Sequence, residues 1–275
     1  NSDQQTSRPA SSRAMSTERG MELVDEGYEI KMAGFEVDCA DGKGEPIACH
    51  HVGEFYSVVK EEFTRSAAVY LTNCKNGYGP SCFNAGRMHL AGKGVEQDDT
   101  KATELFQKSC KSGHLQGCYL NGLMLYNSCL EKEKADKATA SSVGASSGAS
   151  SSAPASASAA VSAPAPVVAK TWAEQARERT EQAKEKRDKT EALKLFDWAC
   201  KEGENDSCYF AASHYLKKDA PDRDPTKALH YLTQSCGTNH APSCFNLAVM
   251  FKHGDLNVPA DAEKFAEYKG RTDSL

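Results

Sequence analysis

The 275-residue chain lacks the features that mark several common classes of protein. No apolar run reaches the length of about 18 residues that a membrane-spanning helix requires. Acidic and basic residues are interspersed with a net charge of −5, so no basic surface for nucleic acid is indicated. Glycine-rich phosphate loops, nucleophile elbows, HExxH motifs and the redox-active CxxC spacing are all absent. The sequence therefore predicts a protein that does not span a membrane, does not bind nucleic acid and is not an enzyme.

Cysteine is abundant, and its positions follow a repeat. Ten of the 11 cysteines form close pairs, four of which enclose seven residues while the first encloses nine. The pairs are Cys39 with Cys49, Cys74 with Cys82, Cys110 with Cys118, Cys200 with Cys208, and Cys236 with Cys244. Successive pairs lie 36 residues apart, from Cys74 to Cys110 and again from Cys200 to Cys236. A period of this length predicts a solenoid of stacked units.

Each cysteine pair lies within a predicted helical hairpin. Ahead of the fourth pair, Ala192, Leu195 and Phe196 have the three- and four-residue separations of one helix face (helix A). After a turn, a second helix (helix B) carries a small residue four positions beyond the second cysteine. These small residues are Gly53, Gly86, Gly122, Ala212 and Ala248. Antiparallel helices joined in this way can bring Cα atoms to the roughly 5.5 Å that a disulfide needs, which predicts one disulfide in every hairpin.

The spacing favours disulfides over metal sites. Structural zinc sites usually place two to four residues between their cysteines, whereas four of these pairs enclose seven. Even pairing at a fixed spacing is typical of an oxidising compartment. Cys129 is left without a partner in the pattern. We expect its thiol to be accessible and inert, with a buried thiol or a link to another chain as the alternatives.

Composition divides the chain into four segments. Residues 1–20 are rich in Ser, Thr and Arg and predict a disordered or processed tail. Residues 21–130 hold the first three hairpins, and residues 131–170 form an insertion rich in Ala, Ser and Pro that is expected to be flexible. Residues 171–275 hold a charged helix, the last two hairpins and a capping helix in which Gly270 occupies the cysteine position. The fold is therefore predicted to be an all-α solenoid of five disulfide-stapled hairpins with a C-terminal capping helix.

The charged helix is expected to run from Trp172 to Cys200. Opposite charges separated by four residues, such as Arg177 and Glu181, stabilise a solvated helix. Its first part has little apolar face. We expect that part to project into solvent or to rest on a partner.

Short motifs within the repeats resemble a known family. The segments that carry the resemblance are Glu36-Val37-Asp38-Cys39, Asn73-Cys74, Ser81-Cys82, Gly92-Lys93-Gly94, Lys108-Ser109-Cys110, Gly113-His114 and Ser243-Cys244-Phe245-Asn246-Leu247. They resemble Sel1-like repeats and, within that group, the cytochrome c oxidase assembly factor 7 family. The resemblance is colinear from about residue 32 to 271 and is interrupted by the insertion at 130–190.

The resemblance implies a non-catalytic scaffold of the mitochondrial intermembrane space. Its implied partners are the disulfide-relay import machinery and protein subunits of respiratory complex IV or of a supercomplex, with the protein peripheral to the membrane. The implied role is the assembly or maintenance of cytochrome c oxidase. Two alternatives remain open: a stable accessory subunit of a respiratory complex, or a secreted cysteine-rich Sel1-like binding protein of a class linked to β-lactam binding.

Haem binding is also proposed for the family that the chain resembles. The positions that would carry the family's two histidine ligands hold Tyr119 and Tyr126 here. His50, followed by His51, is the remaining candidate, although adjacent residues on a helix point about 100° apart. A surface or packing role is the favoured interpretation of His50, and no cofactor, metal or catalytic residue is expected.

Overall fold

A computed structural model describes residues 27, 30–40, 44–218 except 145–171, and 220–275. The chain divides into two compact units, with the boundary between Gly117 and Cys118. The described elements are helices, apart from one isolated bridge between Asp255 and Val258. The predicted tail and most of the predicted insertion lie outside the described residues.

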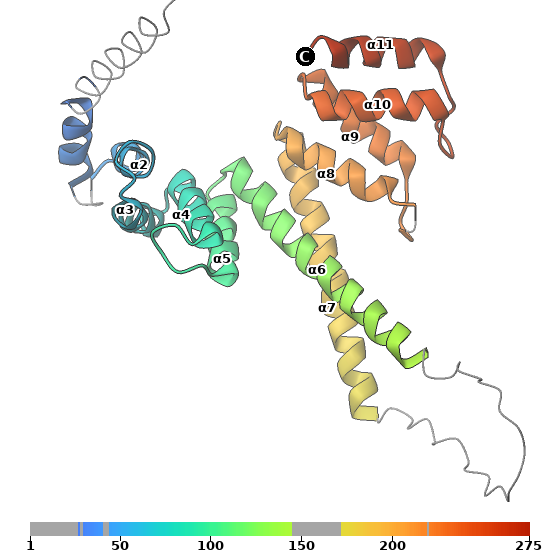
Figure 1. The fold of residues 1–275 in the computed structure, drawn as a ribbon, viewed down its shortest axis with the longest axis horizontal. Coiled ribbons are helices and arrows are strands. Elements are labelled where there is room, and N and C mark those ends of the chain that lie inside the picture. The colour runs from blue at the N-terminus through green and yellow to red at the C-terminus, as the bar shows by residue number, and fades with distance from the viewer. Residues whose placement is uncertain (1–26, 28–29, 41–43, 145–171, 219) are drawn as a thin grey trace, which may run out of the picture. The chain divides into compact units, whose positions relative to one another are not determined.

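The first unit is a series of helical hairpins (Figure 1). It begins with a helix at residues 30–39. There follow α2 (Pro46–Glu54), the π-helical turn η2 (Phe55–Val59), α3 (Phe63–Lys75), α4 (Gly79–Ala91), α5 (Asp99–Lys111) and the start of α6 (Leu115–Gly144). From α2 to α5, each α-helix packs against the next one along the chain. A solenoid is built in this way, because no single hairpin can cover its own apolar face.

Local sequence sets the boundaries of these helices. The carboxylate of Asp98 accepts a hydrogen bond from the backbone amide of Lys101 at 2.9 Å, which caps α5 and lowers the pKa of Asp98. Gly92 ends α4 in the left-handed region at φ +64°. Gly94 also has a positive φ, +71°, and a side chain there would collide with the backbone of Phe63. The Gly-Lys-Gly connector is therefore required both by its backbone conformation and by the lack of space.

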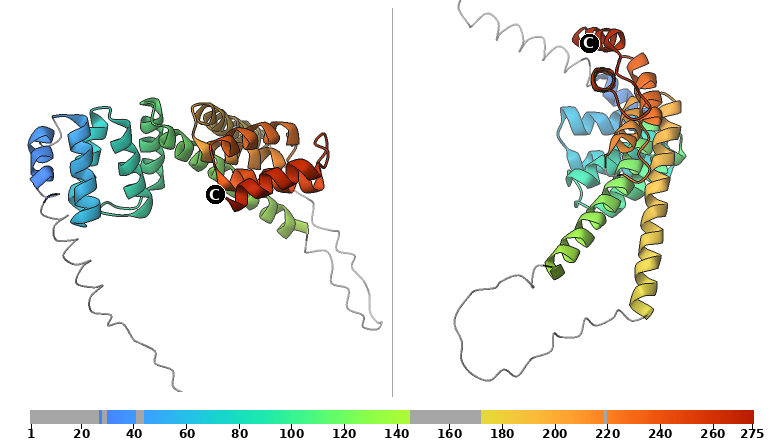
Figure 2. Two further views of the ribbon diagram at one scale, coloured as in Figure 1. Left: turned by 90° about the horizontal axis from the view of Figure 1, so that it is seen from above. Right: turned by 90° about the vertical axis from the view of Figure 1, so that its right-hand side faces the viewer.

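The second unit continues the same arrangement (Figures 1 and 2). It contains the rest of α6, then α7 (Trp172–Lys201), α8 (Asn205–Leu216), α9 (Pro225–Gly237), α10 (Ala241–His253) and α11 (Ala262–Asp273). Each helix from α7 to α11 packs against the next. The helix A pattern ends in α11, where Ala262, Phe265 and Ala266 hold the expected positions. The fold prediction of an all-α solenoid with a terminal helix A is confirmed.

Three of the small residues in the helix B segments, all glycines, each receive a ring from the next helix A. A Cβ atom placed on Gly86 would lie 2.6 Å from the ring of Phe106, and one placed on Gly122 would lie 2.8 Å from the ring of Phe196. Gly53 meets Tyr70 in the same way. The small residue therefore sets the spacing between successive hairpins, because it admits an aromatic ring of the next one.

The structure differs from the sequence analysis around the insertion. Helix α6 extends to Gly144, beyond the expected boundary at residue 130, since residues 131–138 are mostly good helix formers. Helix α7 contacts α6 at mid-length, where Lys189 Nζ lies 3.1 Å from Glu133 Oε1. Arg177 and Arg179, earlier in α7, are exposed. The middle of the charged helix thus rests on another helix of the same chain.

The expectation that Cys129 is accessible was wrong. The residue is 1% exposed, and its thiol donates to the backbone carbonyl of Glu185 on α7 at 3.6 Å. Burial raises the pKa of the thiol, which keeps it protonated and disfavours reaction. The packing of α7 across α6 covers this position, and that packing could not be read from the local sequence.

Candidate functional site

The cysteine pairs occupy equivalent places at the turn of each hairpin. The Cα atoms of Cys39 and Cys49 lie 4.6 Å apart, those of Cys74 and Cys82 4.6 Å, those of Cys200 and Cys208 4.7 Å, and those of Cys236 and Cys244 4.8 Å. All four pairs are joined by disulfides, and Cys110 and Cys118 are disulfide-bonded as well. The geometry agrees with the predicted pairing within hairpins.

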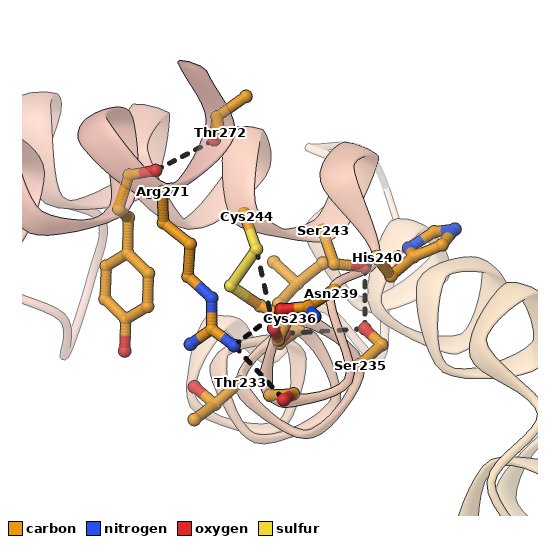
Figure 3. Close-up of a disulfide and its surroundings, with 12 residues drawn as sticks. Thr233, Ser235, Cys236, Asn239, His240, Ser243, Cys244, Arg271 and Thr272 are labelled. Atoms are coloured by element: carbon orange, nitrogen blue, oxygen red, sulfur yellow. Dashed lines mark hydrogen bonds between the residues drawn. A yellow bond between two sulfur atoms is a disulfide. The ribbon is translucent and has the colours of Figure 1, made fainter. Parts of the chain in front are cut away.

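A buried hydroxyl pair lies beside the last disulfide (Figure 3). Ser235 Oγ donates to Ser243 Oγ at 2.6 Å, and His240 Nδ1 lies 2.8 Å from the same Ser243 oxygen. Arg271 of α11 donates to the carbonyl of Gly237 and to Asn239 Oδ1, both at 3.1 Å. These contacts fix the hairpin turn and attach the next helix to it.

The polar pair recurs in the second hairpin and is broken in the fourth. Asn73 Nδ2 donates to Ser81 Oγ at 2.8 Å, at positions equivalent to Ser235 and Ser243. The fourth hairpin has Ala199 in place of the first partner. Ser207 Oγ is consequently buried without a hydrogen-bond partner among the described residues. An unpaired buried hydroxyl costs free energy, so this hairpin is locally destabilised.

We therefore predict that Ala199→Ser stabilises the protein. The new hydroxyl would reproduce the Ser235–Ser243 pair and raise the free energy of unfolding by about 1 kcal/mol, which corresponds to a rise in Tm of roughly 2–4 °C for a protein of this size. Thermal unfolding followed by circular dichroism measures the change. Ala192→Ser, at an equally buried site of the same helix, is the control and should not stabilise. Equal effects of the two substitutions would refute the pairing.

Aromatic rings connect successive hairpins in edge-to-face pairs. The residue directly after the second cysteine of one hairpin meets the residue four positions before the second cysteine of the next. The ring pairs are His50 with Tyr78 at 5.5 Å, Phe83 with His114 at 5.1 Å, and Tyr209 with His240 at 5.8 Å between centroids. All three pairs are T-shaped, a favourable geometry for rings.

One junction uses charge in place of a second ring. At the position equivalent to Tyr78, the fourth hairpin has Glu204, which caps α8 by accepting from the amide of Ser207 at 2.6 Å. The equivalent ring of the preceding hairpin is Tyr119. Burial, followed by the nearby charges of Asp206 and Glu204, raises the pKa of Tyr119 to about 12. The sequence analysis did not pair these two positions, although their fixed spacing from the second cysteine was visible.

His50 belongs to the ring junction with Tyr78, and its surroundings do not fit a haem ligand. Its Nδ1 atom lies 3.1 Å from Ser81 Oγ and its Nε2 atom lies 3.6 Å from Glu54. Its ring packs against Tyr70 and Tyr78, and burial lowers its pKa. His51 Nδ1 is in contact with the same Glu54 carboxylate, at 3.0 Å. Since both nitrogens of His50 face protein groups and its ring contacts Tyr70 and Tyr78, we assign it a packing role.

Tyr126 stands where the family that the chain resembles has its second proposed histidine ligand. Here it belongs to a buried polar network. Its hydroxyl lies 2.8 Å from His214 Nδ1 and accepts from Lys217 Nζ at 2.8 Å. The second nitrogen of His214 lies 2.8 Å from Asp222. Burial acts to raise the pKa of Asp222, but the hydrogen bond from His214 and the electrostatic interactions with His214 and Lys189 together outweigh it and lower the pKa. The network ties α6 to α8 and to the loop that follows α8.

Comparison with known proteins identifies the repeats. The Sel1 repeat family matches residues 79–114, 205–237 and 241–268. The chain contains Sel1 repeats in these three segments. Each matched segment begins with a helix B and includes all or part of the following helix A, for example α4 with α5. The Sel1 unit of this protein thus spans a junction between two disulfide-bonded hairpins, the place where the rings meet.

Relatives of this chain extend along most of its length. A Xenopus tropicalis protein named "Cytochrome c oxidase assembly factor 7" is 24% identical to it. The alignment covers 84% of this chain and 80% of that protein. The chain is 25% identical, with the same coverage, to "Cytochrome c oxidase assembly factor 7A" of Xenopus laevis. The crystal structure of a Sel1 repeat protein from Oxalobacter formigenes superposes with a TM-score of 0.58 at 15% identity, covering 93% of this chain and 81% of that one. This structural likeness supports the fold alone.

The described residues of the chain show neither a membrane-spanning helix nor a group of metal-binding side chains. None of the described helices is both long and apolar enough to cross a bilayer. Among the described residues, no three or more His, Cys, Asp or Glu side chains gather where they could hold a metal ion. The contacts that recur along the chain are the disulfide, the polar pair beside it and the ring junction. They hold the helices of each hairpin, and successive hairpins, in place.

Proposed function

We propose that this protein is a non-catalytic scaffold for the assembly or maintenance of cytochrome c oxidase, acting in the mitochondrial intermembrane space. The observation that carries the proposal is the similarity, over most of both chains, to proteins named cytochrome c oxidase assembly factor 7. The disulfides within the hairpins agree with it, because an oxidising compartment is needed to form and keep them.

The proposed mechanism is the presentation of a rigid surface. Stacked hairpins leave extended faces that bind other proteins. Here the disulfides and ring junctions hold successive helices in fixed positions, so that a bound subunit meets a preformed surface. Preorganisation of this kind reduces the entropy lost on binding. The disulfide-relay import machinery would be the first partner and complex IV subunits the later ones.

Deleting the gene in the source organism tests this function. We expect less mature complex IV on blue-native gels, with restoration by the wild-type chain. Protease protection in intact mitochondria and mitoplasts should place the protein between the two membranes, and alkylation shifts should show ten oxidised cysteines and one free thiol. Normal complex IV levels after deletion would refute the assembly role.

The stoichiometry of the purified protein separates the alternatives. An assembly factor should co-purify with early intermediates in small amounts. One copy per mature complex would instead identify a stable accessory subunit. Secretion of the protein from the cell would favour the extracellular binding protein.

A further inference from the structure

One end of the buried polar network in the second unit is an accessible lysine. Lys217 is the residue at which α8 ends, and it is exposed. Its Nζ atom donates to the hydroxyl of Tyr126 at 2.8 Å and lies 4.8 Å from the centre of the same ring. Tyr126 itself is only 6% exposed. Solvent therefore reaches an amine that is held against a buried phenol.

The groups behind the phenol are arranged to accept a proton. Burial raises the pKa of Tyr126, so its hydroxyl keeps its hydrogen. The pKa of Asp222 lies below its usual value despite partial burial, so this carboxylate is ionised and accepts from His214 Nε2 at 2.8 Å. In the neutral ring, Nδ1 is then the acceptor from the hydroxyl of Tyr126, also at 2.8 Å. A proton can thus pass along this chain from Lys217 to His214.

The surroundings of the amine favour its neutral form as well. Burial, followed by the charge of Lys189 on α7, lowers the pKa of Lys217. The carboxylate of Glu133 acts in the opposite direction and has a smaller effect, and it lies 3.1 Å from Lys189 Nζ. A lysine becomes a nucleophile when desolvation or a neighbouring cation favours the neutral amine. Both conditions are met at Lys217.

We propose that Lys217 is a site of covalent acylation, at which its amine takes an acyl group from a thioester while Tyr126 and His214 remove the proton. The neutral amine attacks the acyl carbon, and the C–N bond forms. Its surplus proton passes to the oxygen of Tyr126 as the phenol's own proton passes to His214 Nδ1, and Asp222 stabilises the imidazolium. The C–S bond breaks, and the thiolate takes up the proton that His214 releases. The products are an amide on Lys217 and a free thiol.

A thioester is the acyl donor that suits this arrangement. Amide formation requires a base for the amine proton, and the chain through Tyr126 provides one. A thiolate leaves without prior protonation, because the pKa of a thiol is only about 8.5. Lys217 is consumed in the reaction, so the protein is modified and is not a catalyst. The modification does not depend on a role in complex IV assembly, because it uses contacts within the second unit alone.

Competition between two neighbouring lysines tests the proposal. The purified, oxidised 275-residue protein is incubated at neutral pH with S-acetyl-N-acetylcysteamine, a small acetyl thioester. Tandem mass spectrometry then follows acetylation at each lysine. Lys218 is the internal control, since it is also exposed, while no hydrogen bond or ion pair joins its amine to another described residue. Lys217 should react at least about tenfold faster than Lys218.

Two variants show whether the network acts as the base. Tyr126→Phe keeps the ring and removes the hydroxyl that links Lys217 to His214. Asp222→Asn removes the charge that orients His214, and its side chain is 49% exposed, so the fold should tolerate the change. Each variant should lower the rate at Lys217 to about that at Lys218 and leave the rate at Lys218 unchanged. Circular dichroism melting curves check that both variants are folded.

A solvent isotope effect separates proton transfer from a purely structural role. In deuterium oxide, acetylation of Lys217 should slow more than that of Lys218, because a proton moves through the phenol during the attack. Tyr126→Phe should abolish this difference.

Two results would overturn the proposal. Equal acetylation of Lys217 and Lys218 in the wild-type protein would show that the contact with Tyr126 has no chemical effect. A rate ratio that neither Tyr126→Phe nor Asp222→Asn changes would show that exposure, and not the network, sets the reactivity. Either result leaves the complex IV deletion experiment unaffected, so the two proposals fail separately.

Discussion

Phe196→Ala should lower the free energy of unfolding by roughly 3–5 kcal/mol, as removal of a buried phenylalanine usually does. Phe196 is 1% exposed and belongs to the core of the second unit. Its ring lies against the small position at Gly122 and within 6.4 Å of the rings of Tyr119, Tyr126 and Phe210. The substitution would leave a cavity where α6, α7 and α8 meet. Urea unfolding followed by circular dichroism measures the loss.

Two further substitutions show whether the ring and the small residue act together. Gly122→Leu alone should destabilise the protein, because its side chain would enter the space of the ring. Combined with Phe196→Ala, the same leucine fills the cavity, so the double variant should be more stable than the sum of the single effects predicts. Trp198→Ala on the same helix, at 41% exposure, is the control and should change stability by less than about 0.5 kcal/mol. Additive effects of the two core substitutions would contradict the packing described for this junction.

The sequence predicted the hairpins because their determinants are local and repeated. Cysteine spacing, helix periodicity and the small residue of helix B all fall within one 36-residue unit, so each unit supports the interpretation of the others. The terminal helix A was predicted for the same reason: Ala262 and Phe265 keep the register even though Gly270 has replaced the cysteine. Stacking followed from the exposed apolar face of a single hairpin.

The contacts between distant residues could not be predicted in the same way. Tyr126 and His214 are 88 positions apart, and no periodic signal links them. The burial of Cys129 depends on where α7 crosses α6, and the unpaired hydroxyl of Ser207 depends on a single change to Ala199. These features arise from exceptions to the repeat. A pattern averaged over all units does not contain them.

Replacing Cys236 and Cys244 together with alanine should destabilise the second unit by roughly 2–3 kcal/mol, the contribution expected of a disulfide that closes a short loop. Both cysteines are fully buried, and their Cα atoms are 4.8 Å apart at the turn to which Arg271 also binds. That loss is a large share of the 5–15 kcal/mol typical of a folded domain. Urea unfolding of the oxidised proteins measures it, and non-reducing peptide mapping checks that the other pairs keep their linkages.

The position of the loss is as informative as its size. Hydrogen exchange should become faster in α9, α10 and α11, because each hairpin depends on its neighbours for burial, while α3 and α4 of the first unit should keep their protection. In cells, a protein destabilised in this way should be less abundant, and complex IV should fall in proportion to that abundance. An unchanged unfolding midpoint would show that the pair does not stabilise the hairpin. Normal abundance together with lost complex IV would assign the sulfur atoms a chemical role and would contradict the scaffold.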